Sequence, residues 1–158
     1  MRVELIEPFV KAAFLVVEAV LSSRPVRGAL AMRRTLATTQ QITIQIGVDG
    51  MVTGQVLYGM SLTTAQMIAS AMTDRPVATM DEMAWSAVSE LANVITGRAT
   101  QLLNDVGYEC TMTPPNVIKG LNVELTVDVP SLVVPMVTLF GCLEISVALY
   151  EAEQAKAA

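Results

Sequence analysis

The residues with the clearest chemical potential stand in the stretch SELANVITGRAT, from Ser89 to Thr100. Glu90 and Asn93 are three positions apart, so on a helix their side chains project side by side, with Cβ atoms about 5–6 Å apart. A carboxylate can pair with an ammonium group or act as a base. A carboxamide can hold a water molecule through both an acceptor and a donor. Together the two side chains could orient a nucleophilic water.

A long helix is predicted to carry this pair. Thr79 and Glu82 have the T-x-x-E spacing of a capping box, and the helix should end near Val106, where a glycine follows. Asparagine and glycine are poor helix formers, and an interior Gly costs about 1 kcal/mol relative to Ala. The presence of Asn93 and Gly97 therefore needs an explanation other than helix stability.

The small polar residues of this helix fall on one side of it. At 100° per residue they lie within about 40° of Ser86. They are Ser86, Glu90, Asn93, Gly97, Thr100 and Asn104. The predicted core face lies opposite and comprises Val88, Leu91, Ile95, Leu102 and Val106. An ordinary solvent face would carry the same polar character but more Lys, Glu, Arg and Gln, whereas small residues leave the backbone open to a partner.

Composition excludes several classes of function. The 158-residue chain has no histidine, and its 15 acidic and 10 basic residues give a net charge of −5. The lack of histidine excludes His-dependent triads, His-ligated zinc and phosphohistidine chemistry. The negative charge argues against a nucleic-acid partner, because phosphate binding depends on clustered Lys and Arg. Cys110 and Cys142 lack metal-binding spacing, so we expect no metal site and two buried thiols in a cytoplasmic protein.

The apolar content is high, with 53% hydrophobic residues and a mean hydropathy of +0.51. The longest uncharged run, residues 129–143, contains two prolines and falls short of the roughly 20 apolar residues that cross a bilayer. We therefore expect no membrane span. A larger core or a homodimer interface would each account for the excess apolar surface. The length suits one domain over residues 1–158, with a tail frayed from about residue 151.

Periodicity predicts the remaining elements. Apolar residues at helical spacing indicate a first long helix over residues 4–21, followed by weakly extended chain. Alternation then predicts a β-hairpin that turns at Asp49–Gly50. Ser61 can cap a short helix that ends near Met72.

Two further alternating stretches are predicted as strands, one over residues 123–129 and one around residues 145–149. The chain then reads as two helix-then-hairpin halves, residues 4–60 and 79–150, which hints at duplication. The predicted fold class is α+β, with a mostly antiparallel sheet covered by two long helices and a shorter one.

Two motifs resemble the CheX branch of the CheC/CheX/FliY phosphatases of bacterial chemotaxis. The first is the helix motif E-x-x-N followed by Gly, at Glu90, Asn93 and Gly97. The second is the segment MTPPNVIKG, similar to the T-P-P-x-V-x-x-G segment that follows that helix, at Thr113, Pro114, Pro115, Val117 and Gly120. The order of elements agrees over nearly the whole chain. E-x-x-N alone is a weak motif, and its combination with the T-P-P segment at this spacing is fairly specific.

The resemblance implies hydrolysis of the aspartyl phosphate on a CheY-like response regulator in two-component signalling. The residue matching Asn93 would position the attacking water, and the one matching Glu90 would pair with the regulator's active-site lysine. The Mg²⁺ would belong to the regulator, so this chain would bind no cofactor. The expected partner contacts are Ser86, Gly97, Thr100, Pro114 and Pro115.

CheC-type members of the family carry the helix motif twice. Here the first helix has Val10 three residues after Glu7 and lacks the asparagine, so a single active helix per chain is expected, as in CheX. CheX relatives can also dimerise, which makes a homodimer an expectation for this chain.

Two alternatives stay open. The chain could be a CheX-like module that binds or scaffolds partners in a sensory or flagellar-switch assembly without catalysis. It could also be an unrelated α+β domain in which Glu90 and Asn93 merely face solvent.

Overall fold

The computed structural model describes residues 2–125 and 129–152. Its helices are α1 (Val3–Leu21), α2 (Leu62–Thr73) and α3 (Glu82–Asp105). Its strands are β1 (Val26–Arg27), β2 (Ala31–Arg33), β3 (Leu36–Ala37), β4 (Ile42–Gly50), β5 (Val52–Met60), β6 (Cys110–Met112), β7 (Asn116–Lys119), β8 (Glu124–Leu125), β9 (Ser131–Thr138) and β10 (Gly141–Glu151). The strand pairs are antiparallel, which confirms the predicted α+β class.

Two hairpins meet in the middle of the main sheet. The strand order is β1-β9-β10-β5-β4-β6, with β2 also paired to β9 and β7 also paired to β4. β5 and β10 are neighbours, and Ile145 lies opposite Tyr58. The hairpins β4–β5 and β9–β10 thus stand on either side of the centre, each preceded in the chain by one long helix, as the predicted duplication requires.

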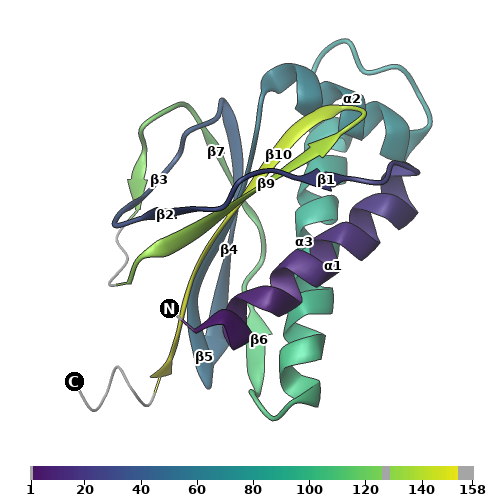
Figure 1. Ribbon diagram of the computed structural model, residues 1–158. Coiled ribbons are helices and arrows are strands. Elements are labelled where there is room, and N and C mark those ends of the chain that lie inside the picture. The colour runs from purple at the N-terminus through teal and green to yellow at the C-terminus, as the bar shows by residue number, and fades with distance from the viewer. Residues whose placement is uncertain (1, 126–128, 153–158) are drawn as a thin grey trace.

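The helices cover one face of this sheet. Figure 1 shows α1 and α3 packed against each other on the same side, with α2 at one end. α1 contacts β10 and α3 contacts β4, so each long helix packs on a strand of the other half's hairpin. None of the helices in residues 2–125 and 129–152 combines the length and hydropathy that a membrane span needs.

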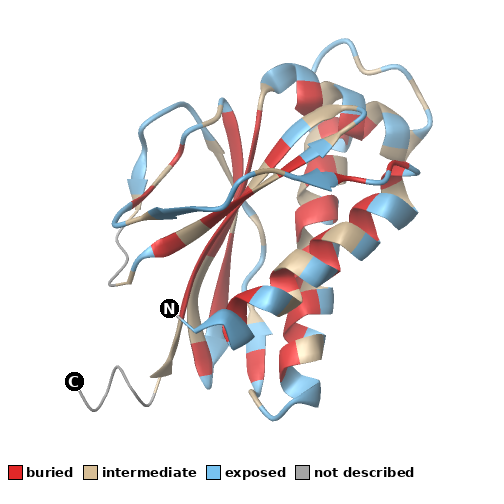
Figure 2. Ribbon diagram, viewed as in Figure 1, coloured by how far each residue is buried: buried red, intermediate tan, exposed pale blue. Residues whose placement is uncertain are grey.

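Alternate residues of the central strands belong to two different cores, because successive side chains of a strand point to opposite faces of the sheet. Val56 and Val147 belong to the main core between the sheet and the helices. Their neighbours Leu57 and Ala148 face the other way and pack with Leu36 in a smaller cluster. Figure 2 shows the buried residues concentrated on the facing sides of helices and sheet.

Two of the predicted helix ends are confirmed, and a third is not. Ser61 caps α2 by accepting a hydrogen bond from the Thr64 amide at 3.1 Å. Beyond α3, Gly107 has φ +96°, which is the left-handed stop expected there. The capping box at Thr79 is wrong, because Asp81 is the N-cap of α3 and helix begins at the next residue.

Several strand predictions also needed correction. The β4–β5 hairpin is confirmed, but its register pairs Val48 with Gly54, which centres the turn on Met51 rather than on Asp49–Gly50. Of the strand predicted over residues 123–129, the described part forms only β8, and residues 126–128 lie outside the described residues. The tail predicted to fray from about residue 151 is still in β10 at Glu151, and residues 153–158 lie outside the described residues.

Two burial predictions were wrong. Cys142 is exposed at the start of β10, whereas Cys110 is buried as expected. The sequence pattern places Val106 on the core face of the long helix, but it is the C-cap of α3 and is 67% exposed. Leu102 on the same predicted face is half-buried, so the core face of α3 lies further round the helix than the sequence pattern indicated.

Candidate functional site

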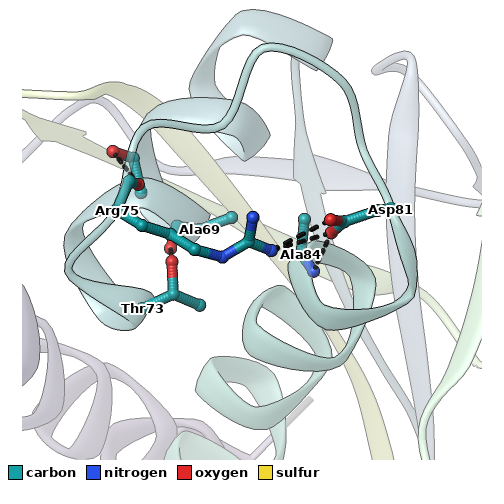
Figure 3. A network of polar contacts seen from close by, with 6 residues as sticks. Ala69, Thr73, Arg75, Asp81 and Ala84 are labelled. Carbon is teal, nitrogen blue, oxygen red and sulfur yellow. Dashed lines mark hydrogen bonds and ion pairs between the residues drawn. The ribbon is translucent and has the colours of Figure 1, made fainter.

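α3 is fixed at its start by a polar network (Figure 3). The Asp81 carboxylate accepts a hydrogen bond from the Ala84 amide at 2.9 Å, and both of its oxygens lie 3.0 Å from Nη2 of Arg75. The backbone bond from Ala84 and the Arg75 guanidinium together lower the pKa of Asp81. Ser70 on α2 donates to the Arg75 carbonyl at 2.7 Å, so the α2–α3 connection is held at both ends.

The middle of α3 is hydrogen-bonded to the sheet. Thr96 donates its hydroxyl proton to the Ala92 carbonyl at 2.9 Å, so the buried Tyr58 of β5 must donate to Thr96 across their 2.7 Å contact. Burial raises the pKa of Tyr58. Because the Ala92 carbonyl belongs to the peptide that joins Ala92 to Asn93, this relay anchors the turn of helix that carries Asn93.

The predicted catalytic pair lies on the outer side of that anchored turn. Glu90 and Ser86 are exposed and Asn93 is half-buried. In this stripe, the side chains of Thr100 and Asn104 form hydrogen bonds. The side chains of Glu90 and Asn93 form none with the residues that the structure describes. A carboxylate and a carboxamide one turn apart are thus available to a molecule that approaches α3.

Thr100 does not belong to the exposed stripe, contrary to the sequence prediction. It is 6% exposed, and its hydroxyl donates to the Gly97 carbonyl at 3.0 Å. Gly97 itself is half-buried. The difference has a local cause, because α3 packs against β6 on this side. This packing buries a flank of the helix that the 3.6-residue period alone would place in solvent.

The strands β6 and β7 run along this flank in the direction opposite to α3. Three contacts establish the alignment: Asn104 Oδ1 accepts from the Cys110 amide at 2.8 Å, a methyl group at Gly97 would lie 3.8 Å from Met112 Sδ, and Lys119 Nζ stands 4.5 Å from the centre of the Trp85 ring. Residue numbers rise along α3 as they fall along β6 and β7. The intervening segment 113–117 therefore passes the part of α3 that carries Asn93.

The T-P-P segment is a fixed interruption between β6 and β7. Both strands pair with β4, and between them Thr113 exchanges two hydrogen bonds with Gly47, at 2.8 and 2.9 Å. Pro114 and Pro115 have no amide hydrogen, so they cannot continue the ladder. Pro114 is exposed and Pro115 half-buried. The contacts on either side of the T-P-P segment thus place it along the flank of α3 that carries Asn93.

Two features of the site had no signal in the sequence. The Tyr58–Thr96 bond joins residues 38 positions apart, and neither residue stands in a recognisable motif. Trp85 packs at the edge of the core, and its cation–π contact with Lys119 depends on where β7 ends. In the described residues, no group of three or more His, Cys, Asp or Glu side chains is arranged to hold a metal ion.

Comparison with solved structures supports the fold. A CheC-like superfamily protein from Shewanella sp. PV-4 is 25% identical, with a TM-score of 0.83 over 95% of this chain and 99% of that one. The chemotaxis protein CheX from Desulfovibrio desulfuricans is 20% identical, with a TM-score of 0.82 over 94% and 99%. A chain of the CheX–CheY–BeF₃–Mg²⁺ complex from Borrelia burgdorferi is 25% identical, with a TM-score of 0.79 over 95% and 100%.

Sequence comparison identifies the family. No curated protein sequence matches this chain. The family described as chemotaxis phosphatase CheX matches residues 42–137, which are more than half of the chain and include Glu90, Asn93 and the T-P-P segment. The chain therefore belongs to the CheX family of chemotaxis phosphatases.

Proposed function

We propose that this protein hydrolyses the aspartyl phosphate of a CheY-like response regulator. Water attacks phosphorus and the bond between phosphorus and the aspartate oxygen breaks. The regulator's carboxylate is released, and inorganic phosphate leaves with the oxygen of the water. The observation that carries the proposal is the Glu90–Asn93 pair, which stands unbonded on an anchored helix in a chain of the CheX family.

Asn93 has the role of placing the water. Its carboxamide offers an acceptor and donors without changing charge, so it can hold a water in line with the phosphorus. An acyl phosphate is already reactive, and positioning of the nucleophile can supply much of the acceleration. The half-buried position of Asn93 suits this role, because its neighbours restrict the side chain.

Glu90 has the role of orienting the regulator. Its exposed carboxylate can pair with the lysine of the regulator's phosphorylation site. The Mg²⁺ would be held by the regulator and would neutralise charge on the phosphoryl group, while this chain contributes Asn93 and Glu90. The similarity to a chain of a CheX–CheY–BeF₃–Mg²⁺ complex supports a partner of this kind.

The test is phosphate release from a purified phospho-regulator, with and without this protein. We expect the wild type to accelerate release and Asn93→Ala to lower that acceleration by about 100-fold or more, as when one positioned catalytic hydrogen-bonding group is lost. Gln101→Ala is the matched control, because it removes an exposed carboxamide from the same helix two turns further on. Its rate should equal that of the wild type.

Both variants should unfold cooperatively at temperatures close to that of the wild type. An Asn93→Ala variant that is folded and fully active would contradict the assignment. A wild type that binds the regulator without changing its rate of phosphate loss would instead identify a non-catalytic binding module.

A further inference from the structure

Lys119 and Trp85 form a charged platform at one end of the candidate site. The ammonium nitrogen of Lys119, the last residue of β7, stands 4.5 Å from the centre of the Trp85 ring in the first turn of α3. Lys119 is exposed and Trp85 half-buried. A cation over the face of an indole is held electrostatically, so the flexible lysine keeps a defined position at the surface.

The charge of Lys119 is not neutralised by the parts of this chain that the structure describes. Arg2, Arg33 and Arg75 each form ion pairs with carboxylates, whereas no described carboxylate lies within ion-pair distance of Lys119. An aromatic ring leaves the net charge of a cation in place. Lys119 therefore projects a positive charge from a chain whose net charge is −5.

The platform lies within reach of any protein that docks on Asn93. Trp85 precedes Asn93 by eight residues, which is about 12 Å along the helix. A standard interface buries about 800 Å² on each partner, equivalent to a disc with a radius of roughly 16 Å. Segment 113–117 leads from the site to Lys119, so the same flank of the molecule carries both features.

We propose that Lys119, held in place by Trp85, pairs with an acidic group on the response regulator beside its aspartyl phosphate. This inference rests on the proposed function. The phosphoryl group is anionic and a bound Mg²⁺ requires carboxylate ligands, so this face of the regulator is acidic. This chain has a net charge of −5 and therefore repels an acidic face, whereas a fixed cation at the rim of the site steers and orients the encounter.

The test is the affinity for a regulator whose aspartate carries beryllofluoride in place of the phosphoryl group, measured by calorimetry at low and high salt. Lys119→Gln should raise Kd by about three- to tenfold at low salt, and the difference should shrink at high salt. Lys119→Arg should restore wild-type affinity. Lys11→Gln is the matched control, because it removes an exposed lysine from α1, and it should bind like the wild type. Equal Kd values for Lys119→Gln and Lys11→Gln would overturn the proposal.

Trp85 gives a second, local measurement, because it is the only tryptophan in the chain. Its fluorescence should change when a tryptophan-free variant of the same regulator binds. Binding that calorimetry detects while Trp85 emission stays constant would place the contact elsewhere and overturn the proposal. The rate of phosphate release is measured separately, with the same wild-type sample. If phosphate release is accelerated but regulator binding does not depend on Lys119, this inference alone is contradicted. If regulator binding depends on Lys119 but phosphate release is not accelerated, the proposed function alone is contradicted.

Discussion

α1 and α3 pack on the same face of one sheet and hold equivalent places in the two halves of the fold, yet their outer surfaces differ. In α3, Glu90 is followed at three residues by Asn93 and then at four by Gly97. In α1 the residues at the same spacing from Glu7 are Val10 and Phe14, which are half-buried and pack against the core. The fold therefore provides two similar helices, and the side chains make one of them a candidate site and the other a scaffold.

The inner surfaces differ in a corresponding way. The buried residues of α1 are all apolar, whereas those of α3 include Thr96 and Thr100. Apolar contact is non-directional and tolerates small shifts of a helix along a sheet. The bond from Tyr58 to Thr96 is directional, so it fixes both the rotation and the height of α3. A helix that must place a water benefits from such a constraint, and a scaffold helix does not require it.

The largest effect that separates the two helices is expected from their glutamates. Glu90→Ala should lower the phosphatase rate by about 10- to 100-fold, because loss of a charged contact at the reacting centre costs roughly 1.5–3 kcal/mol. Glu7→Ala removes an exposed carboxylate from the same helical position of α1 and should leave the rate unchanged. Phosphate release measured for both variants against one regulator makes the comparison.

This pair of variants also tests whether charge alone matters. Each lowers the negative charge of the chain by one, so a general electrostatic effect on regulator binding would change both rates equally. Equal rates for the two variants would mean that α1 and α3 are not functionally distinct.

Much of the fold could be predicted because its signals are local. The alternation in Ile145, Val147 and Leu149 identified the inner face of β10, and all three are buried. The stripe on α3 was found because a 3.6-residue period places Ser86, Glu90 and Asn93 on one side whatever packs against the helix.

The predictions that failed depended on contacts between elements. Thr79 and Asp81 are both acceptable N-caps, and the choice is made by Arg75, which approaches from the end of α2. Thr100 is buried on the flank of α3 that packs against β6, and the position of β6 follows from the order of strands. The sequence pattern also gave no strand around Pro135. The carbonyl of Pro135 accepts a hydrogen bond from the amide of Gly28, which follows β1. The nitrogen and the carbonyl of a strand residue point to the same side, so the missing amide hydrogen of Pro135 is on the β1 side and not on the side of β10.

The next effect in size concerns the anchor of α3. Tyr58→Phe removes the hydroxyl that donates to Thr96 and should lower the free energy of unfolding by about 1–2 kcal/mol, since a buried hydrogen bond is lost. Chemical denaturation at neutral pH measures this loss. The double variant Tyr58→Phe, Thr96→Val should lose less than the sum of the single losses, because it leaves no unpaired hydroxyl in the core. Strictly additive losses would show that the two hydroxyls act independently.

The buried position of Tyr58 also predicts that the stability of the protein depends on pH. Burial raises the pKa of Tyr58 in the folded protein, so its contribution to stability is complete below the unfolded-state pKa near 10. That contribution declines as the pH rises above about 10, because the unfolded chain then releases the proton that the folded protein retains. The wild type should lose stability above this pH more steeply than Tyr58→Phe. Parallel curves for the two proteins would contradict the buried assignment.

The smallest effect is expected at the helix start, where the comparison between α1 and α3 is again unequal. Arg2, the N-cap of α1, makes no side-chain capping bond, whereas Asp81 caps α3. Asp81→Asn keeps a capping oxygen but loses the charge that pairs with Arg75, and Asp81→Ala loses both. Thermal midpoints should therefore fall in the order wild type, Asn, Ala, and the Ala84 amide should exchange with solvent fastest in Asp81→Ala.

The pH dependence of this cap has the opposite sign to that of Tyr58. The pKa of Asp81 is lowered by the Ala84 amide and by Arg75, so its stabilisation is present above the unfolded-state pKa near 4 and is lost as the pH falls further. Asp81→Asn cannot titrate, so the gap between its midpoint and that of the wild type should close in acid. Glu90 lies more than two turns beyond the cap, and phosphate release at neutral pH should be equal in the two proteins. A gap that persists in acid would mean that the charge of Asp81 does not contribute to holding the start of α3.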